Sequence, residues 1–238
     1  MKIRLFTIPN MLTLGNLLCG SAAVVALLLH SDYELAFCLI IASAVCDFFD
    51  GFTARLLKSS SPLGVQLDSL ADMVSFGLVP SMALFCVYDA LPQMLNIADN
   101  VAEMMRYLTF IIVAFSALRL AKFNIDDTQH AEFCGLPTPA NGLFCLSLAM
   151  LMSAGEIVLS KEVIVIISIV MAYLLISPVR MFALKFKGYG LRGNEVRYAF
   201  IVLSVVLIAA FTKYAVPSII VIYILFSAVR WGVQCLKK

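Results

Sequence analysis

Apolar stretches long enough to cross a lipid bilayer recur along the whole chain, with short polar breaks between them. A transmembrane α-helix needs about 20 mostly apolar residues to cross roughly 30 Å of hydrocarbon. The pattern therefore predicts an all-α, polytopic bundle of transmembrane helices, the fifth being the shortest. The eight expected spans are residues 10–29, 35–57, 69–88, 105–123, 140–154, 163–184, 198–213 and 217–233.

Composition agrees with a chain embedded in lipid. Of the 238 residues, 62% are hydrophobic and 13% are charged, whereas about 25% of the residues of a soluble domain are charged. We expect one membrane domain over residues 1–238: an interfacial segment at 1–9, a six-span core at 10–184 and two additional spans at 198–233. The cysteines show no C-x-x-C spacing, and His30 and His130 lie far apart in the sequence, which disfavours a histidine metal site.

Basic residues predict the orientation of these spans. With eight spans both termini lie on one side, and all the Lys and Arg residues except Arg106, Lys161 and Lys213 fall on that side. By the positive-inside rule this side is the cytoplasm, so both termini are expected there. The first apolar run could instead be a cleaved signal peptide, but its span length favours an uncleaved helix. The residues on the cytoplasmic side are Lys2, Arg4, Arg55, Lys58, Arg119, Lys122, Arg180, Lys185, Lys187, Arg192, Arg197, Arg230, Lys237 and Lys238.

Four aspartates interrupt the apolar pattern near the cytoplasmic ends of the second and third spans. Asp47 and Asp50 are i and i+3, and Asp68 and Asp72 are i and i+4, so each pair shares one face of its helix. The short turn between the two spans can bring these faces together. Four carboxylates at the membrane boundary need cations to remain ionised in a low dielectric.

The chemistry of these side chains favours a hard divalent ion, Mg²⁺ or Mn²⁺, because the ligands are all oxygens. Four carboxylates suit two ions, a common device for stabilising in-line displacement at phosphorus. Gly51 and Ala54, one turn from the acids, leave room for a bulky diphosphate or base. Gly64, in the turn expected before the third span, gives similar space there.

Two other interpretations of the acids remain open at this point. The acids could form intramembrane salt bridges with Arg55 and Lys58, but two basic residues cannot neutralise four acids. They could also form the cation path of a transporter, although such a path normally places acids at mid-membrane on several spans. Here the acids are gathered near one surface.

The order of these residues resembles the signature of the CDP-alcohol phosphotransferases. That family's signature is matched by Asp47-x-x-Asp50-Gly51-x-x-Ala54-Arg55, then eight residues, then Gly64-x-x-x-Asp68-x-x-x-Asp72. The resemblance implies a six-helix catalytic core and a homodimer. It also implies that Asp47, Asp50, Asp68 and Asp72 ligate metal, that Asp72 is the general base, and that the CDP group contacts Asp47, Gly51, Ala54, Arg55, Gly64 and Asp68.

Further motifs resemble the phosphatidylserine synthase branch of that family. They are Pro9-Asn10-Met11-Leu12-Thr13, Met73-Val74-Ser75-Phe76-Gly77-Leu78-Val79-Pro80, Arg119-Leu120-Ala121-Lys122-Phe123-Asn124 and Phe133-Cys134-Gly135-Leu136-Pro137-Thr138-Pro139-Ala140-Asn141-Gly142. The branch implies transfer of phosphatidyl from a CDP-lipid to L-serine, with release of CMP. Lys122 departs from the Arg expected there, which leaves the strength of anion binding at that position open.

The residues that would hold the acceptor alcohol or the lipid phosphate are Ser75, Arg119, Lys122 and Asn124. Arg119 could pair with the serine carboxylate or a lipid phosphate, or simply extend to the headgroups. Ser75 and Asn124 could bind substrate or join helices. Glycerol phosphate or inositol phosphate would be alternative acceptors, but a dianionic phosphate should demand a denser basic cluster.

The reaction expected from these features takes place at the cytoplasmic face of a membrane, most simply a prokaryotic inner membrane. Its partners are the CDP-lipid, L-serine and membrane lipids, and nucleic acid is not expected. No nucleophilic Ser, Cys or His is evident beside the acids in the sequence, which favours direct attack over a covalent intermediate.

Overall fold

The computed structural model describes residues 5–125, 133–182 and 194–236. His130 and part of the expected interfacial segment, residues 1–4, lie outside these ranges. So do seven basic residues used for the orientation: Lys2, Arg4, Lys185, Lys187, Arg192, Lys237 and Lys238.

All eight expected apolar spans contain helix. The first two are α1 (Ile8–His30) and α2 (Tyr33–Leu56). The third consists of α3 (Pro62–Asp72), the π-helical η1 (Met73–Leu78), α4 (Val79–Val87) and η2 (Tyr88–Ala90). The fourth consists of α5 (Asp99–Met105), η3 (Arg106–Phe110) and α6 (Ile111–Ile125). The others are α7 (Thr138–Ser153), α8 (Lys161–Ile176), α9 (Glu195–Phe211) and α10 (Ala215–Leu236), with η4 (Thr212–Tyr214) between the last two.

The fold is that of a polytopic helical membrane protein, as the sequence predicted. Five helical stretches are long and apolar enough to cross a bilayer, namely residues 8–30, 33–56, 62–90, 99–125 and 195–233, the last of which contains α9 and most of α10. Helix α7 is apolar but shorter. The strands in the described chain, β1 (Phe133–Cys134) and β2 (Arg180–Met181), form a two-residue antiparallel ribbon beside α10.

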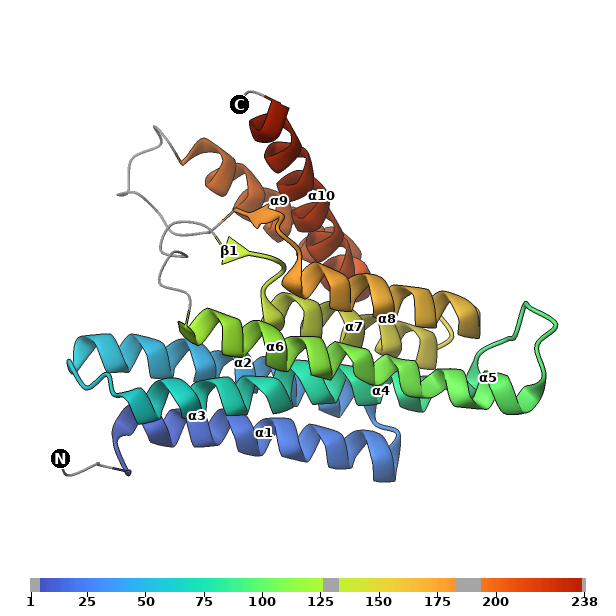
Figure 1. Cartoon of the computed structure of the whole chain (residues 1–238), viewed down its shortest axis with the longest axis horizontal. Helices are drawn as coiled ribbons and strands as arrows, with labels where there is room; N and C mark the ends of the chain where they lie inside the picture. Colours follow the sequence, from blue (N-terminus) through green and yellow to red (C-terminus); the bar gives the residue numbers. More distant parts are fainter. Residues whose placement is uncertain (1–4, 126–132, 183–193, 237–238) are drawn as a thin grey trace.

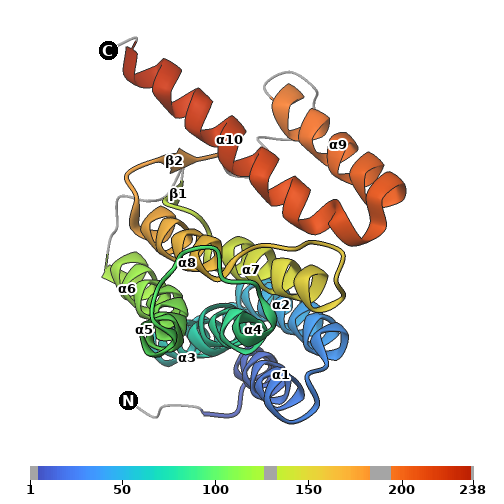
Figure 2. The same ribbon diagram turned by 90° about the vertical axis from the view of Figure 1, so that its right-hand side faces the viewer.

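The third span lies at the centre of the bundle. In the end-on view of Figure 2, α4 is surrounded by α1, α2, α6, α7 and α8, while α9 and α10 lie outside this group. Of its most apolar stretch, 61% is buried, against 22% and 33% for the second and first spans. Fully buried side chains such as Phe76, Leu84 and Tyr88 lie on this span. Two of the four acids, Asp68 and Asp72, are therefore carried by the most buried of the five long spans.

Two local expectations were wrong. Gly64 lies in the first turn of α3, and not in a turn before it, because the Ser61 hydroxyl caps the helix at the Gly64 amide (3.1 Å) and Pro62 begins it. The sixth span was expected to continue to Leu184, but α8 ends at Ile176. Pro178 follows Ser177, and a residue before proline avoids the α conformation; Ser177 is extended, with φ −61° and ψ 152°.

Candidate metal and nucleotide site

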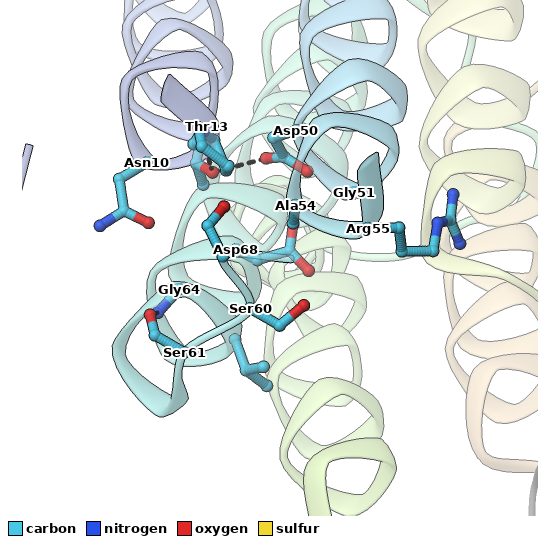
Figure 3. Close-up of a pocket in the computed structure, with 13 residues that line it drawn as sticks. Asn10, Thr13, Asp50, Gly51, Ala54, Arg55, Ser60, Ser61, Gly64 and Asp68 are labelled. Carbon is cyan, nitrogen blue, oxygen red and sulfur yellow. Dashed lines mark hydrogen bonds between the residues drawn. The ribbon is translucent and has the colours of Figure 1, made fainter. Parts of the chain in front are cut away.

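The α2–α3 turn brings three of the four aspartates together. Asp47 and Asp50 come from the last turns of α2, and Asp68 comes from the second turn of α3. One carboxylate oxygen of each lies within 4.8 Å of those of the other two. Figure 3 shows Asp50 and Asp68 on adjacent helices beside the same cavity. The expected convergence of the two helix faces is thus seen in the structure.

These carboxylates fit a divalent cation. Within the described ranges, no ion pair joins a Lys or Arg side chain to any of the four acids, so the salt-bridge interpretation has no support there. Asp68 Oδ1 is buried and has no hydrogen-bond donor. An ionised carboxylate in this position needs a cation or a proton. A cluster of carboxylate oxygens is the donor set that Mg²⁺ and Mn²⁺ prefer.

Asp72 is buried inside the bundle, one helical turn beyond Asp68 on α3. Its side chain is 7% exposed, and Oδ1 accepts a hydrogen bond of 3.1 Å from Asn16 Nδ2 on α1. Its carboxyl group remains close to those of Asp47 and Asp68. The guanidinium of Arg119, on α6, is within electrostatic range of Asp72. Asp72 therefore connects the acid cluster to the interior of the bundle and to the nearest basic side chain of α6.

Helix α1 contributes polar side chains whose roles the sequence did not reveal. The Thr13 hydroxyl donates a hydrogen bond of 2.5 Å to Asp50 Oδ2, and Asn16 donates to Asp72. Asn10, Thr13 and Asn16 are spaced by three residues in an otherwise apolar helix, and all three are buried. That spacing, which places polar groups along one helix face, was the available signal.

A cavity of about 210 Å³ opens between the start of α1, the end of α2 and the start of α3 (Figure 3). A Cβ added to Gly51 would meet nothing within 4 Å, so this part of the wall is open. Of the residues expected to contact CDP, Asp47 alone does not line the cavity. The wall consists of Pro9, Asn10, Thr13, Asp50, Gly51, Ala54, Arg55, Ser59, Ser60, Ser61, Gly64, Val65 and Asp68.

Arg55 lines the outer edge of this cavity without facing the acids. Its side chain is exposed, and Figure 3 shows the guanidinium directed away from Asp50 and Asp68. It is therefore free to reach an anionic group that enters the cavity from the membrane surface.

The four residues expected at the acceptor site do not form one group. Arg119 and Lys122 line a second, small cavity with Phe123, Cys134, Leu175 and Ile176. The Asn124 amide donates to the Ser69 hydroxyl at 2.9 Å and joins α6 to α3. Ser75 is fully buried, and its hydroxyl donates to Asn16 Oδ1 at 2.7 Å.

Arg119 has the features of an anion-binding side chain among these four. Its Nη1 donates to the Thr138 hydroxyl at 2.7 Å, and its Nε is buried without a hydrogen-bond partner. An unpaired guanidinium N–H can receive a carboxylate or phosphate oxygen. Headgroup extension alone would leave these buried donors unexplained.

Comparison with known proteins gives one family. A family model described as CDP-alcohol phosphatidyltransferase matches residues 6–175, which include every acid of the cluster and the whole cavity wall. Relatives named CDP-diacylglycerol–serine O-phosphatidyltransferase include a Bacillus subtilis protein, 41% identical over 139 residues. Others are a Helicobacter pylori protein, 31% identical over 140 residues, and a Methanocaldococcus jannaschii protein, 32% identical over 151 residues.

These similarities cover part of each protein. The matched segments span 58%, 57% and 63% of this chain, and 72%, 54% and 64% of the Bacillus, Helicobacter and Methanocaldococcus proteins respectively. The chain thus spans little more than half the length of the Helicobacter relative.

Proposed function

The chain belongs to the CDP-alcohol phosphatidyltransferase family, and we propose that it transfers the phosphatidyl group of CDP-diacylglycerol, or a related CDP-lipid, to L-serine. The products are phosphatidylserine and CMP. The observation that carries this proposal is the cluster of Asp47, Asp50 and Asp68, in which Asp50 and Asp68 line a cavity that is open at Gly51. The names of the relatives support serine as the acceptor.

In this proposal the nucleotide occupies the cavity between α1, α2 and α3. Gly51, Ala54 and Gly64 give the base and ribose room against the helix backbones, and Arg55 attracts the diphosphate. The acyl chains remain in the bilayer. Asp47 and Asp68 would hold cations that neutralise charge on the diphosphate.

Asp47, Asp50, Asp68 and Asp72 would hold two divalent ions, Mg²⁺ or Mn²⁺. When bound, such ions neutralise charge on the diphosphate and make CMP a better leaving group. Thr13 holds the Asp50 carboxylate and Asn16 holds that of Asp72, so both side chains are oriented before substrate arrives.

Asp72 takes the proton of the serine hydroxyl in the proposed reaction. The serine oxygen forms a bond to the phosphorus on the lipid side of the diphosphate, and the bond from that phosphorus to the CMP oxygen breaks. The sequence placed no nucleophilic side chain beside the acids. In the structure, Ser59, Ser60 and Ser61 line the cavity together with Asp50 and Asp68. We retain direct attack by serine in the proposal. Initial-rate kinetics test it, because a direct route gives a sequential pattern and a covalent intermediate gives a ping-pong pattern.

The acceptor is tested by measuring CMP release from CDP-diacylglycerol by the purified protein with a panel of alcohols. We expect L-serine to support turnover, and glycerol phosphate and inositol phosphate to support little. The basic groups of the expected acceptor region, Arg119 and Lys122, are few for a dianionic phosphate. Turnover with one of those phosphates and none with serine would replace the proposed acceptor. Lack of CMP release with any alcohol would favour a transport function.

Arg119 is proposed to bind the serine carboxylate, with Lys122, Asn124 and Ser75 as further members of the acceptor region. We expect Arg119→Gln to raise the KM for serine by roughly tenfold or more, since a charge-assisted pair is lost. Arg119→Lys should recover part of this effect, because it restores the charge without the planar fork.

Arg106→Gln is the matched control for this substitution. Arg106 is also a partly exposed arginine, at the other end of the same span, and pairs with Asp89 at 3.0 Å. An unchanged KM for serine in Arg119→Gln would show that Arg119 does not bind the acceptor.

The active site is proposed to face the cytoplasm of a prokaryotic inner membrane, as the distribution of basic residues predicts. Single cysteines introduced at positions 58–62, in the α2–α3 turn, should react with an impermeant thiol reagent only from the cytoplasmic side. Cysteines at positions 30–33, in the α1–α2 turn, should react only from the opposite side. The reverse labelling pattern would invert the topology. Assembly as a homodimer is also part of the proposal and follows from the family resemblance.

A further inference from the structure

A buried polar group connects three spans immediately behind the acid cluster. Asn16 on α1 is fully buried, and its Oδ1 accepts hydrogen bonds from Ser43 on α2 (2.5 Å) and Ser75 on η1 (2.7 Å). Its Nδ2 donates to Asp72 Oδ1 at 3.1 Å. Ser43 and Ser75 are also fully buried. We propose that Asn16 is a positioning residue, which Ser43 and Ser75 lock so that its amide N–H holds the carboxylate of Asp72.

The Asp72 carboxylate determines which way the Asn16 amide points, and the two serine hydroxyls bond the oxygen on its other side. An amide has one acceptor atom and one donor group, and an ionised carboxylate can only accept. The opposite orientation would set Oδ1 against the Asp72 carboxylate, which places two acceptors together with no hydrogen between them. In the observed orientation every one of these contacts joins a donor to an acceptor.

The π-helical segment places Ser75 in reach of Asn16. Segment η1 begins at Met73, directly after Asp72, and π-helical turns inside α-helices are frequent at functional sites. Neighbouring helices approach this segment closely through glycines. A Cβ added to Gly20 would overlap the Ser75 hydroxyl, and one added to Gly142 would lie 3.0 Å from the Phe76 backbone. The segment that follows Asp72 is therefore held from both sides.

This inference rests on the proposed function, because it assigns Asn16 a role through Asp72. One oxygen of Asp72 accepts the Asn16 N–H, which leaves the lone pairs of the other oxygen for the proposed metal and the acceptor hydroxyl. A carboxylate that is free to rotate would meet the acceptor hydroxyl in many different orientations. Small displacements of a catalytic group have large effects on rate. Groups that orient metal-binding side chains typically change metal affinity or activity by about 10- to 100-fold when removed.

A double-mutant cycle separates positioning from simple helix packing. We expect Asn16→Ala to lower kcat by about 10- to 100-fold, with the KM for CDP-diacylglycerol changed by less than roughly threefold. In an Asp72→Asn background the same substitution should have little further effect, because there is no carboxylate left to position. Equal losses in the two backgrounds would overturn the proposal, since Asn16 would then act independently of Asp72.

Mn²⁺ binding provides a readout that does not depend on the acceptor. Mn²⁺ is titrated by electron paramagnetic resonance into the purified protein without substrate. Asn16→Ala should weaken Mn²⁺ binding by up to roughly tenfold in the wild-type background and leave it unchanged in the Asp72→Asn background. If another alcohol replaces serine in the wild-type assay, the proposed function fails while this cycle still tests the positioning role. Equal weakening of Mn²⁺ binding in both backgrounds would contradict the positioning role of Asn16.

Milder variants cover the case in which Asn16→Ala does not fold. Ser43→Ala leaves the Asn16 amide in place but removes one of its two locks, so a smaller loss of kcat is expected, again absent in the Asp72→Asn background. Ser81→Ala is the matched control. Ser81 is a fully buried serine on α4, and its hydroxyl donates to the Gly77 carbonyl within its own span. A loss of kcat in Ser81→Ala as large as in Ser43→Ala would point to packing alone.

Discussion

Asp68→Ala should reduce CMP release to near background. Asp68 supplies one of the three clustered carboxylate oxygens, and its Oδ1 is buried without a hydrogen-bond donor. Removing it takes away a proposed metal ligand and leaves Asp47 and Asp50 facing each other with less compensating charge. Asp47→Ala and Asp50→Ala should have effects of the same order.

Chelation should reproduce this loss in the unmodified protein. EDTA should abolish CMP release, and Mg²⁺ or Mn²⁺ added in excess should restore it in the wild type but not in Asp68→Ala. Asp99→Ala is the matched control, because Asp99 is an exposed aspartate in the first turn of α5, far along the bundle from the α2–α3 turn (Figure 1). Full turnover in metal-free buffer would contradict the assignment of metal to this cluster.

Asp72→Asn should produce a more selective defect. The amide keeps the shape of the side chain and some capacity to coordinate, but it cannot take the proton of the acceptor hydroxyl. The rate of transfer to serine should fall by about 10² or more, the size typical of losing general acid–base catalysis. Binding of the CDP-lipid should weaken only modestly, because Asp72 does not line the nucleotide cavity.

Comparison with Asp68→Asn distinguishes the loss of the proposed base from the loss of a metal ligand. Both variants replace a carboxylate by an amide within α3, so general effects on helix stability are matched. Binding of the CDP-lipid, kcat and the pH profile of the remaining activity are measured for both. If Asp72→Asn keeps nearly the wild-type kcat while Asp68→Asn does not, the base is another group.

The helices and the acid cluster could be predicted because both depend on local spacing. Span-length apolar runs have few alternatives to transmembrane helix, since a lipid-exposed backbone must satisfy its own hydrogen bonds. Asp47 and Asp50 share a face by helix geometry, as do Asp68 and Asp72. A short turn between two antiparallel helices then leaves those faces adjacent. The structure shows the resulting group.

The contribution of α1 could not be placed in the same way. Thr13 and Asn16 are 37 and 56 residues from the aspartates that they contact. Which face of α1 meets α2 and α3 depends on packing among apolar side chains that resemble one another in sequence. The same holds for Ser75, whose contact with Asn16 is possible only where Gly20 lets the two backbones approach. The acceptor region was the least predictable part, because Ser75, Arg119 and Asn124 each form a hydrogen bond with a different residue and do not gather in one site.

Transfer of phosphatidyl to serine is tested most directly by following both products of one reaction. Purified protein is incubated with CDP-diacylglycerol, Mg²⁺ and isotopically labelled L-serine, and the labelled lipid and the CMP are quantified together. We expect phosphatidylserine and CMP to form in equal amounts, and neither to form when the CDP-lipid, the metal or the Asp68 carboxylate is absent. Release of CMP without labelled lipid in the complete reaction would contradict serine as the acceptor and direct transfer to it.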